Sequence, residues 1–174
     1  MKTPDSSWVP SIMADYEKPL TRYAAHITGD PERAREVVQD TFLKLCCQKP
    51  AHVRGHLAQW LYAVCRNRAL DVRKKERRMT AISDAQLQLR AHPGPEFSAA
   101  LEEKEQLADV LTILNTLPPN QQEVLRLKFQ GDLSYAEISR ITNLTPGNVG
   151  FLIHTGLKTI RERMRIQPAL RRVK

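Results

Sequence analysis

Apolar residues recur at three- and four-residue steps through the first part of the chain, as they do along a helix that buries one face. One such stripe begins at Ile12 and ends before Gly29. A second follows Asp30, a residue type that caps helices well, and ends before Pro50. A third begins at Leu57 and continues into a run of arginine and lysine. The pattern therefore predicts three helices in this part of the chain.

The helical pattern lapses over residues 80–97, where small and polar residues surround the segment His92-Pro-Gly-Pro95. A continuous helix does not tolerate two prolines around a glycine. This segment is therefore predicted to be a flexible linker between a domain of residues 1–79 and a second domain of residues 98–174. Because no strand pattern and no internal repeat occurs along the chain, the expected fold class is all-α, with two small helical domains.

The second domain is expected to begin with a helix whose apolar stripe consists of Leu107, Leu111 and Leu114. Pro118 ends this helix, because the residue before a proline avoids helical angles. Another helix restarts after it and ends at Gly131, where glycine would adopt the left-handed conformation.

The last two predicted helices have the layout of a helix-turn-helix, in which a three- or four-residue turn joins two helices. Ser134 and Glu137 form a capping box that begins the first helix. Thr145 caps the second, with Pro146 at its first position. The small side chain of Ala136 is expected to let the two helices approach closely.

The second helix of this pair would present its exposed residues to base edges and phosphates in a major groove. These residues are Asn148, Phe151, His154, Thr155, Lys158 and Arg161. A simple helical hairpin would have the same spacing and the same caps. Six cations against one acid after residue 160 favour contact with DNA, but a solvated basic tail would have the same composition.

The composition favours a polyanionic partner such as nucleic acid or an anionic membrane. The chain has 27 lysines and arginines against 19 acidic residues, a net charge of +8. More than half of this excess lies between Arg66 and Arg78, where seven cations accompany two acids. The cations expected to neutralise DNA phosphates here are Arg66, Arg73, Lys74, Lys75 and Arg77. A solvated charged face remains the alternative.

Cysteine usage and hydropathy predict a cytoplasmic location. The three cysteines form an odd set without CxxC spacing, and no basic-then-apolar run precedes a small-residue cleavage site. No apolar stretch approaches the roughly 20 residues of a membrane-spanning helix, so no stable membrane insertion is expected.

The residues give little sign of catalysis or of a cofactor. No Ser-His-Asp set, phosphate-cradling glycine loop or pair of carboxylates stands out, so the chain is predicted to be neither an enzyme nor a cofactor-binding protein. A zinc module is a competing hypothesis, built from Cys46, Cys47, His52, His56 and Cys65. Adjacent cysteines point to different sides of a helix and Pro50 interrupts the spacing, so no metal site is expected.

Three segments, in order, resemble those of the extracytoplasmic-function (ECF) sigma factors, small members of the main bacterial sigma family. Residues 29–44 are similar to the family's segment that binds the clamp helices of the polymerase's largest subunit. The most typical positions of that segment are Gln39, Asp40, Thr41 and Phe42.

Residues 60–75 resemble the family's segment that melts and reads the minus-ten promoter element, and Asn67 stands where the family contacts a flipped base. Residues 117–138 resemble the domain that binds the minus-thirty-five element and the polymerase flap. The resemblance implies three partners: core RNA polymerase, promoter DNA and an anti-sigma factor. A stand-alone helix-turn-helix regulator that binds duplex operators is the alternative function.

The chain departs from the family in the recognition helix. Gly150, Phe151 and Leu152 occupy places where the family commonly has Lys, Ser and Arg, and Thr155 and Leu157 replace two further arginines. A helix with fewer cations predicts a more apolar readout, with Phe151 against thymine methyl groups.

Overall fold

The computed structural model describes residues 8–82 and 101–171, and the regular structure within these ranges is helical. The chain divides into two compact units, within residues 1–94 and 95–174. The predicted all-α fold class with two helical domains is therefore confirmed. Residues 80–82 of the predicted linker continue a helix, and the rest of that linker lies outside the described residues. None of the described helices has a stretch long and apolar enough to cross a membrane.

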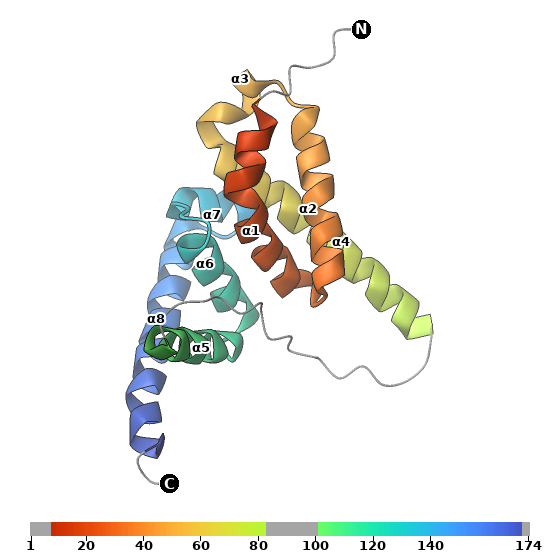
Figure 1. The fold of residues 1–174 in the computed structure, drawn as a ribbon. Helices are drawn as coiled ribbons and strands as arrows, with labels where there is room; N and C mark the ends of the chain where they lie inside the picture. Colours follow the sequence, from red (N-terminus) through yellow and green to blue (C-terminus); the bar gives the residue numbers. More distant parts are fainter. Residues whose placement is uncertain (1–7, 83–100, 172–174) are drawn as a thin grey trace, which may run out of the picture. The chain divides into compact units, whose positions relative to one another are not determined.

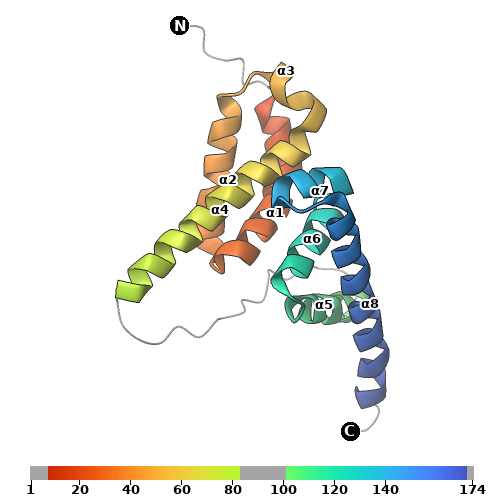
Figure 2. The same cartoon turned by 180° about the vertical axis from the view of Figure 1, so that it is seen from behind.

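The first unit is built on three long helices that pack against one another (Figure 1). Its elements are α1 (Val9–Thr28), α2 (Pro31–Cys46), α3 (Pro50–Val53), the 3-10 turn η1 (Arg54–His56) and α4 (Leu57–Ile82). Seen from behind, α4 runs obliquely across α1 and α2 and its C-terminal half continues past them (Figure 2). Much of the predicted basic run therefore lies on a helix that extends beyond the bundle.

The turn between α1 and α2 follows from local sequence. Gly29 ends α1 with φ 73°, a left-handed conformation that glycine adopts without steric cost. The Asp30 carboxylate then accepts hydrogen bonds from the backbone N–H groups of Glu32 and Arg33, at 2.7 and 3.0 Å. The predicted stop and the predicted cap are both confirmed.

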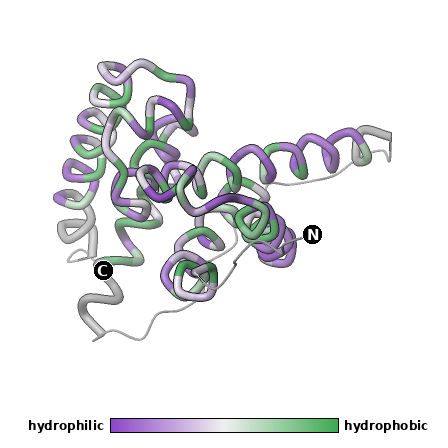
Figure 3. Tube along the Cα trace, turned by 90° about the horizontal axis from the view of Figure 1, so that it is seen from above, coloured by the Kyte–Doolittle hydropathy of each residue, from purple (hydrophilic) through white to green (hydrophobic). Residues whose placement is uncertain are grey.

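The core of the first unit lies where α1, α2 and α4 meet. It contains Leu20 and Tyr23 from α1, Val37 and Leu45 from α2, and Leu61, Tyr62, Cys65 and Ala69 from α4, all fully or almost fully buried. The Tyr23 and Tyr62 rings meet edge to face with centroids 5.3 Å apart. Hydrophobic and hydrophilic positions alternate around the turns of α4, as expected for a helix with one packed face (Figure 3).

The second unit contains the remaining helices, α5 (Leu101–Asn115), α6 (Pro119–Phe129), α7 (Tyr135–Thr142) and α8 (Pro146–Arg171). Its buried residues include Val124, Leu127, Leu133, Ile138, Val149 and Ile153. Gly156 lets α8 approach α6 closely, because a methyl group there would lie 2.9 Å from Leu125 Cδ1. The helix-turn-helix pair α7 and α8 is thus held against α6.

The predicted apolar stripe of α5 is wrong in two of its three positions. Leu107 and Leu111 are 52% and 38% exposed, whereas Leu114 is buried together with Ile113. Helical spacing correctly identifies positions that share a face, but α5 buries only the C-terminal part of its described residues. Periodicity alone does not report how far along a helix its neighbours extend.

Two further expectations about the second unit are wrong. The left-handed residue after α6 is Asp132, with φ 48°, and not Gly131. Aspartate tolerates this conformation because its short polar side chain can bond locally. Ala136 is exposed near the start of α7, and the buried residues of that helix are Ile138 and Ile141. These branched side chains, and not a small one, pack α7 against the unit.

Candidate nucleic-acid interface

Four cations gather on one side of α4. Arg73, Lys74, Arg77 and Arg78 line a shallow depression together with Leu70. Their spacing of three and four residues keeps them on one helical face, and we call these five residues the cationic face. Because the apolar stem of Leu70 lies among the four positive charges, the cationic face suits a ligand with both phosphates and flat apolar groups.

The residues predicted for the minus-ten site are distributed around this face. Arg73, Lys74 and Arg77 belong to it, and Asn67 is exposed two turns before Lys74 on the same side of α4. Lys75 is exposed but does not line the face, and Arg66 is half-buried.

Arg78 lies on the cationic face although it was not among the predicted contacts. It follows Lys74 by four residues, so helical spacing provides a signal that finds it. Conversely, Lys75 does not line the face, because it points about 140° away around the helix axis from Leu70, which lies near the middle of the face. Selecting cations by helical face, and not by their place in a run, would have chosen Arg78 over Lys75.

Two ion pairs connect α4 to α2. Arg68 Nε lies 2.6 Å from Asp40 Oδ2, and Arg33 Nε lies 3.0 Å from Glu76 Oε1. Arg33 also pairs with Glu36 at 3.0 Å. The hydrogen bond and charge of Glu36, together with the charge of Glu76, raise the pKa of Arg33, so this guanidinium stays charged.

The segment predicted to bind polymerase lies on α2, and its four residues differ in exposure. Gln39 is exposed, and Asp40 is partly exposed within its pair with Arg68. Thr41 is fully buried, and its hydroxyl donates to the Val37 carbonyl at 2.8 Å. Phe42 is 4% exposed. The position of Thr41 therefore gives it a packing role.

A groove between α1 and α2 runs beside this segment. Its lining includes Met13 from α1 and Gln39, Phe42 and Leu43 from α2. Leu43 is 65% exposed, which is unusual for a leucine in a packed helix, and it follows the four predicted residues directly. Leu43 cannot be selected from the sequence, because helical spacing alone does not show whether an apolar residue at the border of a stripe is covered.

The helix-turn-helix is fixed by its caps. Ser134 accepts from the Glu137 backbone N–H at 3.3 Å, and Glu137 Oε2 accepts from the Ser134 backbone N–H at 2.8 Å. The Ser134 hydroxyl donates to Glu137 Oε2 at 2.6 Å, and this hydrogen bond, followed by that of the Ser134 backbone N–H, lowers the pKa of Glu137. Asn143 ends α7 with φ 59°, and Thr145 Oγ1 accepts from the Asn148 backbone N–H at 3.2 Å. The predicted capping box and the predicted second cap are confirmed.

Most of the residues predicted to face DNA lie on the exposed side of α8. Asn148, Phe151, His154, Lys158 and Arg161 are exposed, and Phe151 is 63% exposed despite its apolar ring. Thr155 differs, because its hydroxyl accepts from Gln121 Nε2 at 3.2 Å and is turned toward α6. Thr155 therefore holds α8 to α6 in the free protein.

Tyr135 adds a second exposed ring to this surface. A methyl group at Gly150 would lie 3.3 Å from Tyr135 Cε2, so the glycine leaves room for the ring beside α8. Lys128 Nζ lies 5.9 Å from the centroid of the same ring. The replacement of a common lysine by Gly150 is visible in the sequence. Its neighbour Tyr135 is not, because the contact between them is not local.

The residues of the competing zinc module do not come together. Within the part of the chain that the structure describes, no three His, Cys, Asp or Glu side chains are grouped so as to hold a metal ion. Cys46 is half-buried, Cys47 is exposed and Cys65 is buried. Burial raises the pKa of the Cys65 thiol to about 12, as expected for a packed and unreactive thiol.

Comparisons with known proteins match both units. The family model described as Sigma-70 region 2 matches residues 12–79, and the one described as Sigma-70, region 4 matches residues 107–160. The chain is 26% identical to the ECF RNA polymerase sigma factor SigM of Bacillus subtilis over 144 residues, which cover 80% of this chain and 85% of SigM. It is 29% identical to the ECF RNA polymerase sigma factor SigL of Mycobacterium tuberculosis over 148 residues, covering 82% and 80%.

A solved structure shares the fold. It is the sigma factor RpoE in complex with the anti-sigma factor NepR from Bartonella quintana. The TM-score is 0.69 at 20% sequence identity, and the match covers 90% of this chain and 96% of that one.

Proposed function

Because the chain belongs to the sigma-70 family and is an ECF RNA polymerase sigma factor, we propose that the surfaces described above divide the work of promoter recognition between its two units. The cationic face and Asn67 engage the minus-ten region, and the exposed side of α8 engages the minus-thirty-five region. The observation that carries this proposal is the cationic face, since its four cations lie on one side of a helix that extends past the bundle. The part of α4 that extends past the bundle is accessible to a nucleic acid.

Promoter melting needs no catalytic residue in this scheme. Unstacking a base pair costs a few kcal/mol, and a protein without an ATP site can offset this cost by binding bases that have already left the stack. Asn67 is exposed and carries both donors and acceptors, so it can bond the edge of an extruded base. The cations nearby then neutralise the phosphates of the same strand. This role is that of a transcription initiation factor.

Polymerase binding is assigned to the exposed part of α2. Gln39, Asp40 and Leu43 are accessible there, whereas the buried Thr41 supports the segment from inside. An exposed leucine beside polar side chains is the composition of a protein interface, where an apolar anchor lies within a polar rim. We expect Leu43→Ala to weaken assembly with core polymerase more than Thr41→Ser does.

In the second unit, the exposed side of α8 presents an aromatic ring, Phe151, between two positions, 150 and 152, where the family commonly has cations. Phe151 can contact thymine methyl groups in the major groove, and Asn148 can pair with adenine. Lys158 and Arg161 continue the same side of the helix and suit phosphates. This arrangement supports a readout that depends on T–A pairs.

An anti-sigma factor is a further proposed partner. The solved relative of Bartonella quintana is bound to one, and the fold is shared. We also propose that this chain acts in the cytoplasm, because core RNA polymerase and promoter DNA are found there. The alternative function, a stand-alone regulator, is not supported by the first unit. It would leave the unit that matches region 2 without a function.

Reconstitution tests the proposal. The full chain is mixed with purified core RNA polymerase, and the complex is isolated by gel filtration and used for transcription from a randomised promoter library. We expect co-elution and transcripts that start downstream of a common sequence. A chain that binds duplex DNA alone but fails to co-elute with core polymerase would refute the proposal and favour the stand-alone regulator.

A further inference from the structure

The basic segment of α4, from Arg66 to Arg78, contains two acids, Asp71 and Glu76. Their negative charge opposes the binding of DNA. The two acids lie in different surroundings. Asp71 is exposed, whereas Glu76 is half-buried and accepts a hydrogen bond from Arg33 at 3.0 Å. Arg33 lies in the first turn of α2, so the Glu76 pair ties the basic segment of α4 to another helix.

A second ion pair also joins α2 to α4. Asp40 on α2 meets Arg68 on α4 at 2.6 Å. The two α2 residues are seven positions apart and the two α4 residues are eight apart, which is about two helical turns in each case. The polarity is reversed between the pairs, since α2 supplies the base in one and the acid in the other. Sliding α4 by two turns would place Arg68 beside Arg33, so the wrong register brings like charges together.

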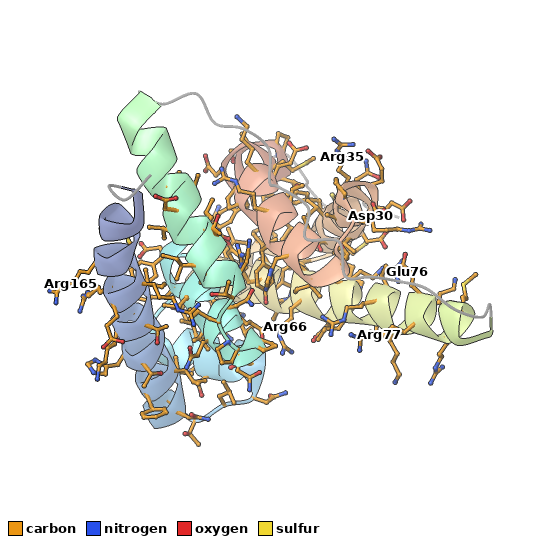
Figure 4. The ribbon with its side chains drawn as sticks, turned by 90° about the horizontal axis from the view of Figure 1, so that it is seen from below. Asp30, Arg35, Arg66, Glu76, Arg77 and Arg165 are labelled. Carbon is orange, nitrogen blue, oxygen red and sulfur yellow. The ribbon has the colours of Figure 1, made fainter. Side chains whose placement is uncertain are left out.

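Glu76 borders the cationic face of α4 but does not line it. Around the helix axis it lies about 60° from Arg73, about 100° from Arg77 and about 160° from Lys74. Figure 4 shows Glu76 on the side of α4 toward Asp30, at the start of α2, and Arg77 on the other side. Fixing Glu76 against α2 therefore also fixes the direction in which the cationic face points.

We propose that Glu76 is a positioning residue that, through Arg33, holds α4 in the register and rotation that present the cationic face to DNA. This inference rests on the proposed function, because it requires the cationic face to bind DNA. The proposal predicts that removing the charge of Glu76 changes DNA affinity in the direction opposite to that expected from charge alone. Removing an acid from a DNA-binding segment should strengthen binding by Coulomb's law, whereas removing the positioning contact should weaken it.

The test compares the isosteric variants Glu76→Gln and Asp71→Asn in the full chain. Each loses one negative charge from the same helix. Binding is measured by fluorescence anisotropy with a labelled single-stranded oligonucleotide of mixed sequence at constant salt. We expect Asp71→Asn to bind more tightly than the unmodified chain, and Glu76→Gln to bind up to about fivefold more weakly, the scale of an exposed ion pair.

The Arg33→Ala background shows whether Glu76 acts through Arg33. Once that partner is absent, Glu76→Gln should strengthen binding as Asp71→Asn does. The inference is overturned if Glu76→Gln strengthens binding in the unmodified chain, or if its weakening persists in the Arg33→Ala background. Failure of the proposed function would look different, because Asp71→Asn, Lys74→Ala and Arg77→Ala would then all leave binding unchanged.

Discussion

Lys74 and Lys75 are neighbours in sequence with the same charge, yet the structure gives them different positions. Lys74 lines the cationic face, and Lys75 is exposed on another side of α4. We therefore expect Lys74→Ala to reduce the salt dependence of DNA binding, and Lys75→Ala to leave it nearly unchanged. The comparison is closely matched, because both variants lose one positive charge and one flexible side chain from adjacent helical positions.

The magnitude follows from counterion release. Each phosphate neutralised on a single strand contributes about −0.7 to the slope of log affinity against log salt. Four cations on the face predict a slope of about −2.8, and hence an affinity that falls about 50-fold between 50 and 200 mM salt. Removing Lys74 should bring the slope to about −2.1 and the fall to about 20-fold.

The slope is measured by fluorescence anisotropy with a labelled single strand of mixed sequence at five salt concentrations. The proteins compared are the unmodified chain, Lys74→Ala and Lys75→Ala. Circular dichroism checks that their helix content is equal. Equal reductions of the slope in Lys74→Ala and Lys75→Ala would refute the reasoning, because phosphates would then respond to the total charge of the segment and not to one face of α4.

The remaining predictions concern the second unit. Gly156→Ala should have a free energy of unfolding up to about 3 kcal/mol below that of Gly147→Ala, because the added methyl group would lie 2.9 Å from Cδ1 of the buried Leu125; thermal unfolding measures this. The depressed pKa of Glu137 contributes stability that is present above its unfolded-state pKa and is lost as pH falls through the folded-state value, so Glu137→Gln should flatten the melting temperature between about pH 6 and pH 3. Phe151→Ala should abolish any preference for thymine over uracil in the minus-thirty-five region, measured by replacing thymidine with deoxyuridine in the promoter.

Each of these predictions has a control. Gly147→Ala lies on the same helix, where a methyl group meets nothing within 4 Å, so it should not destabilise the protein. Equal melting temperatures for the two alanine variants would contradict the packing argument. If the melting temperature of Glu137→Gln falls with pH as steeply as that of the unmodified chain, the capping box is not the cause of the acid sensitivity. Retained discrimination between thymine and uracil in Phe151→Ala would show that another group reads the methyl.

The sequence by itself determined the features that depend on neighbouring residues. Gly29, Asp30, Ser134 and Thr145 were predicted to stop or cap helices, and the structure confirms all four. A cap joins groups two or three residues apart, so the residue types in one short segment are sufficient to specify it. Helical spacing likewise separates buried from exposed positions wherever one face of a helix packs along its length.

Tertiary structure decided which side of each element is used and over what length. Asp40 and Arg68 are 28 residues apart, and Arg33 and Glu76 are 43 apart, and nothing local in the sequence selects these partners. Nothing local in the sequence shows that Leu111 is exposed, either. It is exposed because α5 packs only over its C-terminal part. A side chain's partners across a helix interface depend on the rotation and register of both helices, and these are set by packing of the whole unit.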